Sequence, residues 1–158
     1  MRKTLAIIIS ILGFNLTLFA QIDFQNPPWE TGCDSLTSQL EMNICSYEKY
    51  SIADSILNDQ YDTLLKYIDN QYQKEFEMFI DSNDIIQKDY LQNLKVQKES
   101  IIKSREDFKV FLESTVEILN AQYQGGSMRP MVVNMYSLEL TINQIKILEN
   151  IIDEIVNR

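Results

Sequence analysis

Between residues 40 and 79, apolar side chains recur every three or four positions, the spacing that places side chains on one face of an α-helix. This pattern predicts one long helix. Ser38 and Glu41 have the spacing of a capping box, which indicates that the helix begins there. The polar residues 81–84 interrupt the pattern and predict a turn. The apolar stripe consists of Ile44, Tyr47, Tyr50, Ala53, Leu57, Tyr61, Leu64, Ile68, Tyr72, Phe76 and Phe79.

A second long helix is predicted over residues 85–122, because apolar positions again recur at helical spacing. The period is less regular over residues 95–99, where we expect either a kink or a solvated section. Gly125 and Gly126 end the helix, since glycine readily adopts the left-handed conformation of a helix exit. The apolar positions of this helix are Ile86, Tyr90, Leu94, Ile101, Phe108, Phe111, Val116 and Leu119.

The C-terminal part of the chain predicts two shorter helices. Pro130 suits the first turn of a short helix that ends near Tyr136. Thr141 and Gln144 have capping-box spacing and predict the start of a final helix. Its apolar stripe consists of Ile145, Leu148, Ile152 and Ile155. Since no segment has the pattern of a strand, the predicted fold is all-α: an antiparallel helical bundle of two long helices plus a short and a medium C-terminal helix.

The first 20 residues have the layout of a secretory signal peptide, with two basic residues, an apolar segment and a small residue, Ala20, before the cleavage point. A membrane anchor is the alternative, but Asn15 and Thr17 interrupt the apolar segment, which is shorter than the ~20 residues of a spanning helix. No cysteine lies near Ala20, so a lipid-modified N-terminus is not expected. We therefore expect a cleaved signal peptide over residues 1–20 and a soluble periplasmic or secreted protein without a membrane span.

Residues 21–32 contain two prolines and a glycine and lack an apolar period, so we expect an extended, poorly ordered arm. Trp29, the only tryptophan, is expected to pack against the core and so attach this arm to it. The helical domain then covers residues 33–158.

The chain is acidic, with 14 basic and 23 acidic residues and a net charge of −9. Removal of the signal peptide would delete Arg2 and Lys3, leaving 12 basic against 23 acidic residues, a net charge of −11. This charge argues against binding to nucleic acid or to anionic membranes and favours a cationic partner. The alternative is that the charge serves only solubility.

Both cysteines, Cys33 and Cys45, lie near the start of the first long helix, and the chain has no histidine. In an exported protein, two cysteines indicate one disulfide rather than a metal site. Two free thiols are the alternative, and a redox pair is disfavoured because the spacing does not resemble Cys-x-x-Cys. We expect no metal and no other cofactor.

Two blocks of sequence, which follow one another along the chain, resemble a known family. The first consists of Cys33, eleven intervening residues and Cys45, followed by Ala53-Asp54, Leu57-Asn58 and Tyr61. The second consists of the run Tyr123 to Pro130, with Gly125-Gly126-Ser127 inside it, followed by Leu140-Thr141. Together they resemble the LprI-like lysozyme-inhibitor family of secreted bacterial proteins. The resemblance implies an exported protein-binding domain whose partner is a cationic protein such as lysozyme. The rival hypothesis is a structural or envelope-stress accessory protein of the periplasm without lysozyme activity.

The chain departs from the family pattern at two places. The family's second disulfide would join positions near Val116 and Tyr136, where both cysteines are absent, so we expect an apolar contact instead. The family's Gln-x-x-Trp-x-x-Tyr-Arg-Asp run corresponds to residues 105–113, with Leu112 in place of the arginine. If the family's arginine contacts a partner, this contact is lost at Leu112. If it pairs with the first long helix inside the protein, Leu112 replaces that pairing with apolar packing.

Several polar residues lie on or beside the apolar stripe of the first helix, where they cost free energy unless they are hydrogen-bonded. We expect a buried polar network that joins this helix to the glycine loop, either as a structural clamp or as a direct partner contact. Because the chain offers no histidine base and no nucleophile motif, these carboxylates do not indicate an enzyme. The residues concerned are Glu41, Asn43, Asp54, Asn58 and Tyr61, with Gln39 beside them.

The segment around the glycines is the candidate partner-binding loop. Gly-Gly-Ser allows backbone amides to approach another molecule closely, and Met128 and Arg129 supply an apolar and a charged side chain. If the protein inhibits a lysozyme, we expect this loop to occlude the active-site cleft. The alternative is that the glycines only turn the chain. The loop residues are Tyr123, Gly125, Gly126, Ser127, Met128 and Arg129.

Overall fold

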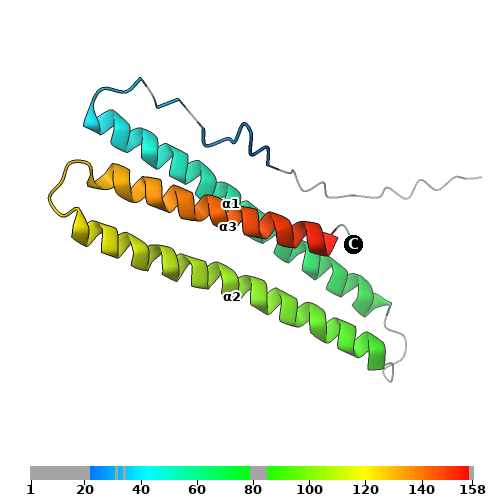
Figure 1. Ribbon diagram of the computed structural model, residues 1–158. Helices are drawn as coiled ribbons and strands as arrows, with labels where there is room; N and C mark the ends of the chain where they lie inside the picture. The colour runs from blue at the N-terminus through cyan, green and yellow to red at the C-terminus, as the bar shows by residue number, and fades with distance from the viewer. Residues whose placement is uncertain (1–21, 31, 34, 79–84, 157–158) are drawn as a thin grey trace, which may run out of the picture.

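The protein is a bundle of three helices in a computed structural model that describes residues 22–30, 32–33, 35–78 and 85–156 (Figure 1). The helices are α1 (Gln39–Glu77), α2 (Ile85–Gln122) and α3 (Arg129–Val156). The described residues contain no strand, so the all-α prediction is confirmed. The predicted signal peptide, Phe79 and the turn at 81–84 lie outside these ranges. None of the described helices combines the length and the apolar character needed to cross a membrane.

The start of α1 is fixed by a cap and by a disulfide. The Ser38 hydroxyl accepts a hydrogen bond from the Glu41 backbone N–H at 3.2 Å, and the Glu41 carboxylate accepts one from the Ser38 backbone N–H at 3.2 Å. The predicted capping box is therefore confirmed. Cys33 and Cys45 form the predicted disulfide, which ties the segment before α1 to the second turn of the helix. Such a closed loop stabilises the fold mainly by restricting the unfolded chain.

The core lies along the middle of α1, where α3 and α2 cover the helix. The central part of the predicted stripe, including Leu57 and Tyr61, is buried. The two ends of the stripe, by contrast, are exposed. Near the N-terminus of α1, α3 packs against the face that carries Asn43 and Ser46, which leaves Ile44 exposed. The buried core residues are Trp29, Ala53, Leu57, Tyr61, Leu64, Ile68, Leu94, Ile101, Ile145, Leu148 and Ile152.

The C-terminal segment forms one continuous helix, α3, where the sequence had predicted a short helix and a medium one. Thr141, the expected cap, is fully buried inside the helix, and the Gln144 side chain bonds to Tyr61 instead of capping. Ser137, Thr141 and Ile145 follow one another at four-residue spacing on the face that α3 buries. A break before Thr141 would interrupt this face, so packing overrides the local capping signal.

The other uncertain segments also have definite structures. Helix α2 continues through residues 95–99, where Gln97 and Glu99 are exposed, so this section is solvated. The arm, expected to be extended, makes two turns between residues 23 and 30. Trp29 is 4% exposed and belongs to the core, and the Ile22 backbone N–H donates to the Glu149 carboxylate at 3.1 Å. The arm is thus fastened to the bundle, as predicted for Trp29.

Leu57→Ala should test whether the central stripe is the core. Leu57 is 3% exposed, so we expect a loss of about 2–5 kcal/mol in the free energy of unfolding, from lost burial and the cavity left behind. Ile44→Ala is the matched control, since Ile44 is 50% exposed on the same helix and should cost less than about 1 kcal/mol. Urea denaturation measures both, and equal effects would mean that the stripe has been placed on the wrong face.

Candidate functional site

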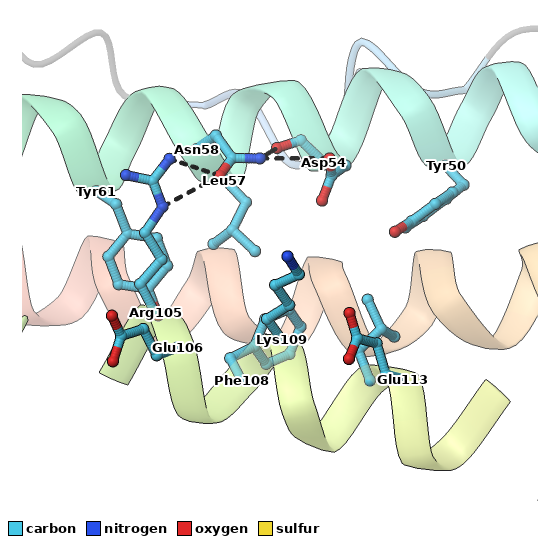
Figure 2. A pocket seen from close by; sticks show the side chains of 11 residues that line it. Tyr50, Asp54, Leu57, Asn58, Tyr61, Arg105, Glu106, Phe108, Lys109 and Glu113 are labelled. Carbon is cyan, nitrogen blue, oxygen red and sulfur yellow. Dashed lines mark hydrogen bonds between the residues drawn. The ribbon is translucent and has the colours of Figure 1, made fainter. Parts of the chain in front are cut away.

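A cleft of about 480 Å³ opens between α1 and α2, at mid-length of α1 (Figure 2). Its lining combines apolar, aromatic and charged side chains, which is the mixture typical of binding sites. Helix α1 supplies Tyr50, Asp54, Leu57, Asn58 and Tyr61, and α2 supplies Arg105, Glu106, Phe108, Lys109, Leu112 and Glu113.

One end of this cleft is closed by the guanidinium group of Arg105. Its Nη2 and Nε donate to the Asn58 side-chain oxygen at 2.7 and 3.2 Å, and its Nη1 donates to the Asp62 carboxylate at 2.6 Å. Asn58 in turn donates to the Asp54 backbone carbonyl at 2.8 Å and to the Asp54 carboxylate at 3.3 Å. Because the Asn58 oxygen accepts two bonds from a charged donor, this contact holds α2 firmly against α1.

Tyr61 extends the network to the third helix. Its ring is 1% exposed, and the Arg105 guanidinium lies 5.8 Å from the ring centroid. The Tyr61 hydroxyl accepts a hydrogen bond from Gln144 Nε2 of α3 at 2.8 Å and shares one with the Ser104 hydroxyl of α2 at 3.2 Å. A buried hydroxyl needs such partners, and here they come from both neighbouring helices.

The residues predicted to form one polar network are divided among three places. Asp54, Asn58 and Tyr61 line the cleft together. Glu41 lies at the cap of α1 and is exposed. Asn43 lies eleven residues before Asp54, about 16 Å along the helix, and reaches the glycine loop instead. This separation follows from the helical rise alone, so the sequence could already have divided Asn43 from Asp54.

Arg105 was missed as a site residue by the sequence reasoning. It is the only arginine within α1 and α2. A lone arginine beside a helix that carries several amides and carboxylates is a signal that could have pointed to an interhelical contact. The register of α2 against α1 was needed to place it opposite Asn58.

The glycine loop, residues 123–129, lies at the end of the bundle between α2 and α3 (Figure 1). Gly125 has a φ of +79°, which only glycine adopts without strain, so this residue is required by the turn. The Gly126 backbone N–H donates to the Tyr123 carbonyl at 3.1 Å, and the Arg129 N–H donates to the Gly126 carbonyl at 3.2 Å. The loop is therefore a compact turn with its own hydrogen bonds.

Polar contacts attach this loop and the start of α3 to α1. The Asn43 side chain donates to the Ser127 carbonyl at 3.3 Å and accepts from Gln39 Nε2 at 3.0 Å. The Asn134 side chain of α3 donates to the Ser46 hydroxyl at 3.2 Å. The loop is thus held in place, while its residues 123–128, Tyr123 and Met128 among them, are exposed.

The structure describes all three residues at which the chain departs from the family pattern. Leu112 is 8% exposed and lines the cleft facing α1, which favours repacking over the loss of an outward contact. Val116 is half-buried and Tyr136 is exposed. Among the described residues, no cluster of acidic or cysteine side chains could hold a metal ion.

Arg105→Leu should lower the free energy of unfolding by about 1–3 kcal/mol, because the half-buried Asn58 oxygen would lose both of its charged donors. Lys103→Leu is the control on the same helix. Lys103 pairs with Asp107 at 2.6 Å on the exposed surface and should cost no more than about 0.5 kcal/mol. Thermal and urea unfolding of both variants measure the loss in the free energy of unfolding. An Arg105 variant as stable as the control would show that the network is not a clamp.

Comparison with known families identifies residues 33–148 as matching the model of the lysozyme inhibitor LprI. This range holds 116 of the 158 residues and includes both cysteines, the cleft and the glycine loop. No curated protein and no solved structure matches the chain. Because the match extends over well more than half of the chain, the protein belongs to the lysozyme inhibitor LprI family.

Proposed function

We propose that this protein is exported, remains soluble and inhibits a lysozyme by covering the entrance to its active site. The match to the lysozyme inhibitor LprI family over residues 33–148 carries this proposal. The activity is binding, so the protein needs a stable, exposed contact surface rather than a reactive group.

Export is supported by two features of the N-terminal region. The first 20 residues have the layout of a cleaved signal peptide. Cys33 and Cys45 form a disulfide, and disulfides persist mainly in oxidising compartments outside the cytosol. Lysozymes act on the cell wall, so a protein in the periplasm or outside the cell would meet them.

The charge of the chain suits a basic partner. After removal of the signal peptide, 12 basic residues stand against 23 acidic ones, a net charge of −11. Lysozymes are typically basic, so the two proteins attract each other at long range. Such attraction mainly raises the association rate, and it weakens as salt shortens the screening length to about 8 Å at physiological ionic strength.

The glycine loop is the proposed contact element because it combines exposure with a fixed position. Its attachment to Asn43 means that little conformational entropy is lost when a partner binds. On the neighbouring turns of α1, the apolar side chains of Leu40, Ile44 and Tyr47 are exposed. We propose that the loop enters the active-site cleft and that these three side chains contact its rim.

Gly126→Trp should reduce inhibition at least about tenfold, because the bulky side chain would occupy the space that the partner needs. Gly126 is the better position for this test than Gly125. A Cβ on Gly126 would lie 3.4 Å from the Tyr123 carbonyl oxygen, an ordinary contact, whereas Gly125 needs its positive φ. Lysis of cell walls by lysozymes of several classes, with increasing amounts of the protein, measures the effect.

Ser55→Trp is the matched control, since Ser55 is exposed on α1, about 18 Å along the helix from Asn43. This variant should inhibit like the wild type, and circular dichroism should show equal helicity in all three proteins. Undiminished inhibition by a folded Gly126→Trp variant would exclude the loop. Failure of the wild type to inhibit any lysozyme would instead favour an accessory role in the cell envelope.

A further inference from the structure

The cleft between α1 and α2 contains charged groups that the proposed contact with lysozyme does not use. Asp54 lies about 16 Å along α1 from Asn43, the residue that contacts the glycine loop. A protein bound at the loop would therefore leave this part of the cleft open. Its volume of about 480 Å³ falls within the range of small-molecule sites.

The base of the cleft is apolar. Leu57 of α1 and Leu112 of α2 are buried there, and the half-buried ring of Phe108 lies beside them. An aliphatic group placed against these side chains would be removed from water, which is favourable in proportion to the apolar area covered.

Charged groups of both signs line the cleft, Asp54 on α1 and Arg105, Glu106, Lys109 and Glu113 on α2. Figure 2 shows the Asp54 carboxylate of α1 and the Lys109 ammonium of α2 directed into the space between the helices. Within the part of the chain that the structure describes, neither group forms an ion pair. Arg105 differs, because Asn58 and Asp62 already engage its guanidinium. Asp54 and Lys109 thus face the same space without forming an ion pair with each other.

Tyr50 adds a neutral polar group to the same space, into which its hydroxyl points (Figure 2). Burial, and after it the charge of Asp54, raises the pKa of this hydroxyl above its ordinary value. The hydroxyl therefore stays protonated at neutral pH and can donate a hydrogen bond to an anionic group.

We propose that this cleft binds a small zwitterion with an apolar side chain, either a free apolar amino acid or a dipeptide of such residues. The ligand's ammonium group meets Asp54, its carboxylate meets Lys109, and its side chain covers Leu57 and Leu112. A simple cation would be repelled by Lys109, and a simple anion by Asp54. A ligand with both charges pairs with Asp54 and Lys109 at the same time.

Titration of the ¹⁵N-labelled protein with L-leucine and with leucyl-leucine, followed by NMR, tests this site. At least one of the two should shift the amide signals of Asp54, Leu57, Lys109 and Leu112 in a saturable manner. The N-acetyl form of that ligand lacks the ammonium group, and its methyl ester lacks the carboxylate. Each should bind at least about tenfold more weakly, because one charge-assisted hydrogen bond is lost.

Substitutions of Asp54 and Lys109 test whether these two residues bind the charged groups of the ligand. Asp54→Asn and Lys109→Met should each weaken binding about tenfold, whereas Glu117→Gln, an exposed acid one turn beyond the cleft, should bind like the wild type. Equal binding by all variants would overturn the proposal. So would tighter binding of the methyl ester than of the zwitterion, which would identify a site for a basic side chain, or the absence of saturable shifts with both ligands.

Discussion

The three helices depend on one buried side chain, Tyr61, for their relative position. Its ring fills the centre of the core on α1, and its hydroxyl is bonded to Gln144 of α3 and to Ser104 of α2. Sliding either helix along α1 by one residue, about 1.5 Å, would stretch one of these bonds and leave a buried polar group unsatisfied. Apolar packing alone is less demanding, since neighbouring turns of a helix present similar surfaces. Tyr61 therefore sets the register that the rest of the bundle follows.

From this register follow the two regions that we connect with function. With α2 fixed at Ser104, Arg105 lies opposite Asn58 and Asp62 and closes one end of the cleft. With α3 fixed at Gln144, its first turns lie beside Ser46, which accepts a hydrogen bond from Asn134, and Asn43 holds the glycine loop at the end of the bundle. The cleft and the loop are thus separate regions on one rigid frame. The disulfide and the cap stabilise the part of α1 that supports the loop.

The sequence was sufficient for features that depend on neighbouring residues. The period of three and four placed Leu57, Tyr61 and Ile68 in the core, and the spacing of Ser38 and Glu41 located the start of α1. Features that depend on the register between helices could not be predicted in this way. Arg105 was overlooked because nothing in α2 alone shows that it faces Asn58, and Thr141 was taken for a cap because its burial arises only in the folded bundle. Asn43 and Asp54 were placed in one network for a different reason: they share a face of α1, but their separation of about 16 Å along the helix was not considered.

In this proposal, the bundle is a rigid frame that meets its partner at the glycine loop. Amide hydrogen exchange, measured by mass spectrometry on the protein alone and with an excess of lysozyme, locates the contact. We expect new protection in residues 123–129 and in the exposed first turns of α1, with exchange at the cleft unchanged. Protection centred on the cleft residues around Asp54 and Lys109, or no protection with any class of lysozyme, would show that the glycine loop is not the contact.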